Sequence, residues 1–366
     1  IVMSSMIFIN NVVAPVSAVS EAAKRISGGS SGGSAVLVAA GAVAASIGTD
    51  TGDSVRKPAA YNGVIGVKPT YGRISRYGII PYASSLDHVG YFTTNVEDAC
   101  TMLEVLAGRD DRDMTSSQRP VEAYLNQLDS SLEGKVIGIL DNVQEAIQDA
   151  QIRENLEDLM KKLEDRGAEI RHVRMPQELM ETILPVYLTI ANAEATANHS
   201  NLDGIRFGMR EDGESVEEVM MNSRTKGFSA YVRKRFIIGS YSLFVENQDK
   251  LFRKAQKIRR LIVDHYRSLF EACDCIIASA APNVAPLEND AADEAMGIEH
   301  MVADNHMQLG NFSGYPSMTL PSGFVDGLPI GVNITCRPFE EQMMFNIAKA
   351  IEEETGLADN TVEVKA

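Results

Sequence analysis

Two serine residues in glycine-rich surroundings are the strongest candidates for chemistry in this chain of 366 residues. Ser30 lies in the sequence GGSSGGS, and Ser54 follows it in the sequence DTGDS. A serine hydroxyl becomes a useful nucleophile when a base takes its proton and backbone N–H groups receive the charge that develops on the substrate oxygen. Glycine-rich turns at helix entrances can supply those N–H groups. The alternative is that both stretches are only tight turns.

The base that would activate such a serine is less visible in the sequence. Six histidines are present, and none of them shares a motif with the two serines. His88, in SSLDHVG, is the nearest candidate, and we interpret it as an ordinary structural histidine. A Ser-His-Asp triad therefore has no visible base, and a Ser-Lys arrangement becomes the natural alternative.

The segments around the two serines are expected to position them against a buried core. Residues 35–47 (AVLVAAGAVAASI) are small and apolar, which predicts a central helix packed against a sheet. Residues 48–92 alternate glycines with short apolar runs, which predicts short buried strands and tight turns that line a site.

The remainder of the chain is predicted to form alternating strands and helices. A buried strand, a charged amphipathic helix and a second strand follow one another at residues 135–140, 148–166 and 168–175. This β-α-β pattern predicts an α/β fold with a mixed, mainly parallel central sheet covered by helices. Other predicted elements are helices at 96–107 and 340–354, a mostly helical insertion at about 176–272, a strand at 273–282 and, at 317–335, two strands joined by an Asp-Gly turn.

Composition excludes several classes of protein. With 34 Lys+Arg against 50 Asp+Glu, the net charge is −16, so a nucleic-acid surface built by this chain alone is not expected. The four cysteines form no CxxC pair and no disulfide pattern, which predicts no metal site and fits a reducing cytoplasm.

The apolar opening, interrupted by Asn10, Asn11 and Pro15, fits neither a signal peptide nor a membrane span. The chain begins with Ile1, which we interpret as a fragment boundary.

Taken together, GGSSGGSA at 28–35, Ser54 in GTDTGDSVRKPAAYNGVIGVKPTYGRIS and their spacing closely resemble the amidase signature family. The resemblance implies a catalytic Ser-cisSer-Lys triad in which Ser54 is the acyl-forming nucleophile and Ser30 the bridging serine. It further implies a cis peptide bond between Gly29 and Ser30. The oxyanion hole would be formed by backbone N–H groups of the nucleophile turn, namely Thr51, Gly52, Asp53 and Ser54.

Later segments, including KRFIIGSYSL and ADNHMQLGNFSGYPSMTLP, are similar to the A subunits of glutamyl-tRNA(Gln)/aspartyl-tRNA(Asn) amidotransferases. That resemblance implies a glutaminase that supplies ammonia for amidation of mischarged tRNA. Glutamine carries a carboxylate and an ammonium, so its recognition needs a fixed cation and a fixed anion. By motif, Arg235 would bind the carboxylate, Asp304 the ammonium, and Tyr187 would line the pocket. Without the resemblance, the same residues would be taken as a surface Arg, a helix Asp and a core Tyr.

The resemblance also implies partners and a location. A B subunit would use ATP and Mg and bind most of the tRNA, a small C subunit would clasp the other two, and this chain would need no cofactor of its own. The complex would be cytoplasmic, without a membrane partner.

Two departures from the family pattern stand out. The family's catalytic Lys lies about 75 residues before the bridging serine, whereas Lys24 is the only lysine upstream of Ser30 and does not match its motif. Residues 1–26 are therefore interpreted as a divergent segment that precedes an amidase-signature domain at 27–366, and the chain alone is expected to be inactive. Asp53 replaces a glycine of the usual T-G-G-S, and its carboxylate is expected to repel an oxyanion.

Two other functions remain open. One is a stand-alone amidase acting on a different carboxamide, and the other is a non-catalytic scaffold that docks the B and C subunits.

Overall fold

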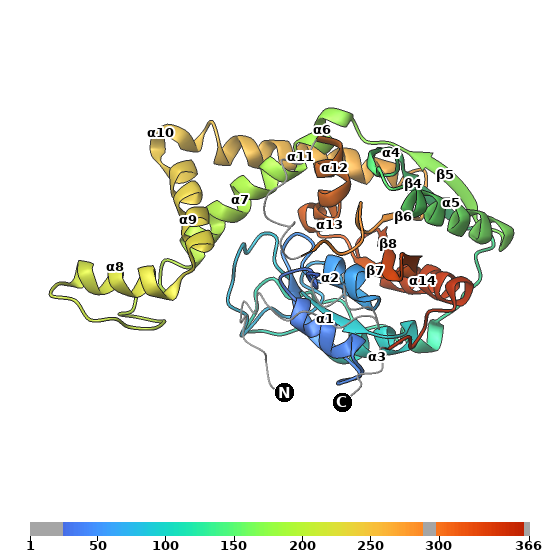
Figure 1. Ribbon diagram of the computed structural model, residues 1–366, viewed down its shortest axis with the longest axis horizontal. Helices are drawn as coiled ribbons and strands as arrows, with labels where there is room; N and C mark the ends of the chain where they lie inside the picture. Colours follow the sequence, from blue (N-terminus) through green and yellow to red (C-terminus); the bar gives the residue numbers. More distant parts are fainter. Residues whose placement is uncertain (1–24, 288–297, 362–366) are drawn as a thin grey trace.

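The centre of the molecule is a mixed sheet of eight strands in the order β1-β3-β2-β7-β8-β6-β4-β5. It is seen in a computed structural model that describes residues 25–287 and 298–361 (Figure 1). The strands are β1 (Ser46–Asp50), β2 (Ile65–Lys68), β3 (His88–Thr93), β4 (Val136–Leu140), β5 (Glu169–Val173), β6 (Cys275–Ser279), β7 (Ser317–Val325) and β8 (Leu328–Cys336). The predicted segment 1–26 falls almost wholly outside the described residues, so its boundary stays a prediction.

Strand pairing confirms a mixed sheet but not a mainly parallel one. Among the described strands, only β4–β5 and β4–β6 pair in parallel, as the β-α-β pattern predicted. The other five neighbouring pairs of this sheet are antiparallel. The expectation was wrong because the glycine-rich half shows no clear strand period, and it contributes three antiparallel strands. The Asp-Gly turn between β7 and β8 is confirmed, with positive φ at Asp326 (52°) and Gly327 (77°).

Helices cover both faces of the sheet. On one face lie α3 (Val96–Leu106), α5 (Ala150–Asp165) and α14 (Glu341–Thr355), which share a large apolar core with the central strands. On the other face lie α1 (Gly32–Ala39), α2 (Arg56–Asn62), α4 (Asp141–Ala146), α12 (Ile298–Asn305) and α13 (Gln308–Ser313). A short 3-10 helix, η2 (Leu125–Gln127), lies in the connection to β4. The candidate active site lies on this second face of the sheet.

The residues between β5 and β6 are mostly helical, in the region where the sequence predicted a helical insertion. They form α6 (Gln177–Glu181), α7 (Ile183–Asn198), α8 (Val216–Gly227), α9 (Ala230–Leu243), α10 (Val245–Gln248) and α11 (Phe252–Leu269). Figure 1 shows α8, α9 and α10 as an arm that projects from the body of the molecule. Among the helices that the structure describes, none combines the length and the apolar character needed to cross a membrane.

The predicted helix over residues 35–47 is only partly correct. Helix α1 ends at Ala39, Gly41 adopts a left-handed conformation (φ +64°), and residues 42–44 are exposed before β1 begins at Ser46. Gly41 ends the helix because a glycine takes this conformation at little steric cost. The small apolar run therefore becomes a helix, a turn and an edge strand.

Candidate active site

The nucleophile motif forms a tight turn between β1 and α2. The strand ends at Asp50, whose carboxylate accepts a hydrogen bond from the backbone N–H of Val55 at 3.0 Å. Within the described part of the chain, the N–H groups of residues 51–54 have no hydrogen-bond acceptor. Consecutive unpaired N–H groups are rare in a folded interior, and they form a ready binding site for a negatively charged oxygen.

A buried arginine holds this turn in shape. The Arg56 guanidinium is fully buried and donates to the Asp50 carboxylate at 2.9 Å, to the Gly52 carbonyl at 2.8 Å and to the Asn311 side-chain oxygen at 2.6 Å. Burial alone would raise the pKa of Asp50, but the neighbouring guanidinium holds it well below its ordinary value. In a trans peptide the C=O and the following N–H point in opposite directions. The Asp53 N–H is therefore directed away from Arg56.

The Ser30 turn docks directly on the nucleophile turn. The peptide bond between Gly29 and Ser30 is cis, as the family resemblance implied. The N–H of Ser31 donates to the carbonyl of Ser54 at 3.1 Å, which brings the two serine motifs together. Gly28 lies against α2 with a left-handed φ of +76°, and a Cβ there would lie 3.0 Å from the Cα of Pro58. Ser30 is exposed and Ser54 is half-buried, so neither side chain is enclosed in the core.

Asp53 does not extend freely toward solvent. Its carboxylate lies 3.0 Å from the ammonium of Lys57, one turn further along the chain. The same ammonium donates to the side chain of Asp304 at 2.7 Å and to its backbone carbonyl at 2.6 Å. Although burial opposes its charge, the two carboxylates raise the pKa of Lys57 above its ordinary value. Burial raises the pKa of Asp53, and Lys57 counteracts that shift.

The turn accommodates Asp53 in both its backbone and its charge. The φ of Asp53 is not positive, so the residue needs no conformation reserved for glycine. Its carboxylate is paired with the ammonium of Lys57. The effect of Asp53 on an oxyanion stays a prediction.

The remaining predicted residues line the other side of the turn. The Tyr187 ring packs on Gly52, where a Cβ would lie only 3.0 Å from the ring. Arg235 donates to the hydroxyl of Tyr82 at 2.9 Å. The backbone of Tyr82 is in turn held by Asp87, which also accepts the Thr51 hydroxyl at 2.7 Å. Burial raises the pKa of Tyr187, as do Tyr82 and Asp53 nearby.

Several residues of this site were missed by sequence reasoning. Arg56 and Lys57 follow Ser54 after one intervening residue, and their acidic partners Asp50 and Asp53 precede it. The i,i+4 spacing of Asp53 and Lys57 could have suggested that ion pair, whereas Asp50 and Arg56 are six residues apart and gave no such signal. The contact from Lys57 to Asp304 joins residues far apart in the chain, and no sequence signal pointed to it. Among the described residues, no group of three or more His, Cys, Asp or Glu side chains could hold a metal ion.

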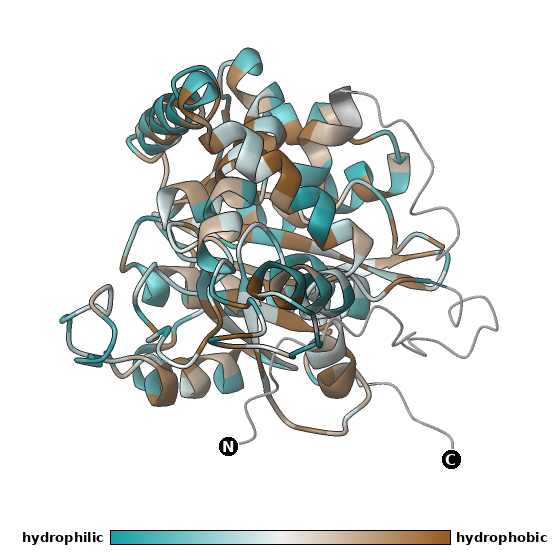
Figure 2. Ribbon diagram, turned by 90° about the vertical axis from the view of Figure 1, so that its left-hand side faces the viewer, coloured by the Kyte–Doolittle hydropathy of each residue, from teal (hydrophilic) through white to brown (hydrophobic). Residues whose placement is uncertain are grey.

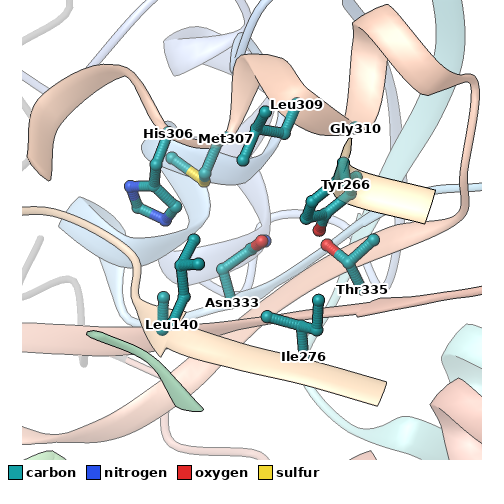
Figure 3. Close-up of a pocket in the computed structure, with 10 residues that line it drawn as sticks. Leu140, Tyr266, Ile276, His306, Met307, Leu309, Gly310, Asn333 and Thr335 are labelled. Atoms are coloured by element: carbon teal, nitrogen blue, oxygen red, sulfur yellow. The ribbon is translucent and has the colours of Figure 1, made fainter. Parts of the chain in front are cut away.

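A separate small cavity lies behind the site, beneath α13 (Figure 3). His306, Asn333, Thr335 and Tyr266 contribute its polar groups, and none of the predicted site residues lines it. The Nδ1 atom of His306 lies 2.8 Å from the carbonyl of Ala303, whereas the buried Nε2 has no partner among the described residues. Burial lowers the pKa of His306 to about 4, so this histidine is neutral near pH 7. We assign this cavity to the supporting interior.

Comparison with known proteins agrees with the geometry. A family model described as Amidase matches residues 11–345. The chain belongs to the amidase family. The chain is 40% identical over 325 residues to the A subunit of the glutamyl-tRNA(Gln) amidotransferase of Persephonella marina, covering 88% of this chain and 66% of that protein. The corresponding A subunit of Lacticaseibacillus casei is 38% identical over 330 residues, covering 90% and 67%. The chain thus spans about two thirds of the length of these curated relatives.

Solved structures share the fold of this chain. The A subunit of the glutamyl-tRNA(Gln) amidotransferase of Thermotoga maritima superposes with a TM-score of 0.75 at 33% identity, covering 94% of this chain and 70% of that one. The peptide amidase of Stenotrophomonas maltophilia superposes with a TM-score of 0.74 at 26% identity, covering 93% and 69%. The predicted amidase-signature fold is confirmed.

Proposed function

We propose that this amidase is the glutamine-hydrolysing component of a tRNA-dependent amidotransferase, supplying ammonia for amidation of Glu-tRNA(Gln) or Asp-tRNA(Asn). One observation carries the proposal: Ser54 lies in a turn whose N–H groups lack acceptors within the described part of the chain, directly against the Ser30 turn. The similarity to amidotransferase A subunits supports the choice of glutamine among possible amides.

In the proposed reaction the Ser54 hydroxyl attacks the side-chain amide carbon of glutamine. Negative charge then develops on the amide oxygen, and the N–H groups of residues 51–54 stabilise it. The Ser54 proton passes through Ser30 to a general base, which returns it to the departing nitrogen as ammonia leaves. Water hydrolyses the acyl-serine and releases glutamate.

Lys57 does not serve as that base, although it lies close to Ser54. Its pKa is raised by Asp53 and Asp304 against the effect of burial, so the amine is held protonated. The family resemblance assigns the base to a lysine upstream of Ser30. Within the described residues, no lysine is hydrogen-bonded to either serine.

Substrate recognition is proposed on the two sides of the turn. Arg235 would bind the α-carboxylate, since its guanidinium is held by Tyr82 on the side where Tyr187 closes the pocket. Asp304 would be the anion that faces the α-ammonium. Tyr187 would pack against the aliphatic part of glutamine.

Partner subunits are proposed to cover the helical arm. Exposed apolar side chains lie on α9 and at the start of α10. The arm that contains these helices faces the viewer in Figure 2. The exposed apolar side chains are Ile237, Tyr241, Phe244 and Val245, with exposed fractions between 57% and 90%. A patch of this kind is typical of a protein interface. The net charge of −16 agrees with tRNA, ATP and Mg being bound mainly by the B subunit, in a cytoplasmic complex that also contains a C subunit.

Glutamine hydrolysis measured with and without B and C subunits tests the proposal. We expect release of glutamate and ammonia in the assembled complex when this chain is joined to a segment that carries the upstream lysine, and loss of this activity when Ser54 is replaced by Ala. Hydrolysis of other amides without the partners would instead favour a stand-alone amidase. A complex that forms but releases no ammonia would favour the scaffold function.

A further inference from the structure

The Asp53–Lys57–Asp304 cluster contains an ammonium group at the place where a substrate ammonium is proposed to bind. Lys57 Nζ has three hydrogens, and three oxygens lie within 3.0 Å of it: one from Asp53 and two from Asp304. The donors of this lysine are therefore fully matched. The structure shows directly that Asp304 can hold an alkylammonium.

The cluster is within reach of the nucleophile. Asp53 is the neighbour of Ser54 in the chain, and Asp304 is separated from Asp53 only by the shared ammonium. The side chains of Asp53 and Asp304 keep exposed fractions of 21% and 24%, against 11% for Lys57. The two acids are thus more exposed than the lysine, which lies deeper.

We infer that Lys57 is a specificity-determining residue that competes with the α-ammonium of a substrate for Asp304. The competition has an electrostatic cause, because a second ammonium on Asp304 would lie within a few ångströms of the first, where like charges repel strongly. A substrate amide that has a carboxylate but no α-ammonium meets no such competition. The site therefore accepts monoamides of dicarboxylic acids, such as glutaramate, at least as well as glutamine.

Asp53 has a defined part in this competition. It holds Lys57 from the other side, so the lysine remains in place when a ligand approaches Asp304. Asp53 and Lys57 therefore act as a pair, and neither should be tested alone. This inference rests on the proposed function, since it takes Arg235 and Asp304 as the two ends of the substrate site.

The experiment compares the equilibrium binding of two ligands by calorimetry, on proteins that carry Ser54→Ala so that neither ligand is hydrolysed. The ligands are L-glutamine and glutaramate, which differ only in the α-ammonium. The test variant is the double substitution Asp53→Gly with Lys57→Gln, which removes one charge of each sign. The net charge of the cluster is unchanged, so a change in preference reports the position of the lysine rather than the overall field. A Lys57→Arg variant, which keeps the cation, is the matched control.

We expect glutaramate to bind the parent protein at least as tightly as glutamine does. In the double variant, glutamine affinity should rise by roughly tenfold or more, with glutaramate affinity nearly unchanged, and Lys57→Arg should resemble the parent. The inference is overturned, and the proposed function is not, if the parent protein prefers glutamine by about tenfold. The same holds if the double variant leaves the preference between the two ligands unchanged. Absence of binding for both ligands in every folded variant would instead refute the proposed glutamine site, and the inference with it.

Discussion

Replacing Arg56 with Met tests how the nucleophile turn is held. The guanidinium is fully buried, and its partner Asp50 is equally inaccessible. Removing one member of a buried ion pair leaves an uncompensated charge, which costs about 3–5 kcal/mol. Arg56 also donates to the Gly52 carbonyl and to Asn311, so we expect a loss at the upper end of that range. Urea unfolding followed by circular dichroism measures the change.

Two companion variants test whether the stability loss of Arg56→Met comes from the unpaired charge of Asp50. Adding Asp50→Asn to Arg56→Met removes the stranded carboxylate charge, so part of the stability should return. Arg253→Met is the surface control, because the ion pair of Arg253 with Asp249 at 2.8 Å is exposed on both sides. Such pairs contribute about 1 kcal/mol or less.

The rate of covalent labelling at Ser54 is a second measure of how Arg56 holds the turn. Since Arg56 fixes the peptide that directs the Asp53 N–H, the folded fraction of Arg56→Met should react more slowly with a glutamine-analogue electrophile at Ser54. A stability loss no larger than that of Arg253→Met, together with unchanged labelling, would refute the idea that Arg56 organises the turn.

Three further predictions concern single side chains. Ser54→Ala should abolish covalent labelling by a glutamine-analogue electrophile, whereas Ser30→Ala should slow labelling but leave it on Ser54; mass spectrometry that places the adduct on Ser30 would reverse the roles. Arg235→Ala should raise the KM for glutamine by about ten- to a hundredfold in the assembled enzyme, with little effect on a small uncharged amide, and equal losses for both would show a structural role. His306 has a folded pKa of about 4 against an ordinary value of 6.5, so the unfolded chain binds the extra proton first and stability falls as the pH drops from about 6.5 to 4. His306→Phe should remove up to about 3 kcal/mol of that dependence in urea melts at several pH values, and an unchanged slope would contradict the assignment.

Local signals predicted the parts of the fold that depend on short-range structure. The Asp326–Gly327 turn was correctly placed because positive φ at both positions is a property of these residue types. The parallel pairs of β4 followed from an apolar run, a helix and another apolar run in succession. The antiparallel half of the sheet was missed because β1, β2 and β3 lie in a glycine-rich region where strand and turn look alike.

The site shows the same division between local and long-range information. Motifs indicated Ser30 and Ser54, and the structure brings their turns together through the Ser31 N–H. The position of Asp304 on Lys57 depends on how α12 packs against α4, α6 and α7, which no local pattern encodes. The chemical roles of these residues stay predictions until the variants are measured.

The charges around the nucleophile turn explain how an aspartate can lie beside a developing oxyanion. Helix α2 begins with two cations, Arg56 and Lys57, at the end where the helix dipole disfavours positive charge. Asp50 and Asp53, just before the helix, balance them at 2.9 and 3.0 Å. Within these two pairs the charges cancel, so Asp53 adds no net charge beside residues 51–54, while Asp304, which shares Lys57, leaves one further negative charge in the cluster. The unpaired N–H dipoles of residues 51–54 favour negative charge on the substrate oxygen. We therefore expect Asp53 to be compatible with catalysis only while Lys57 is its partner.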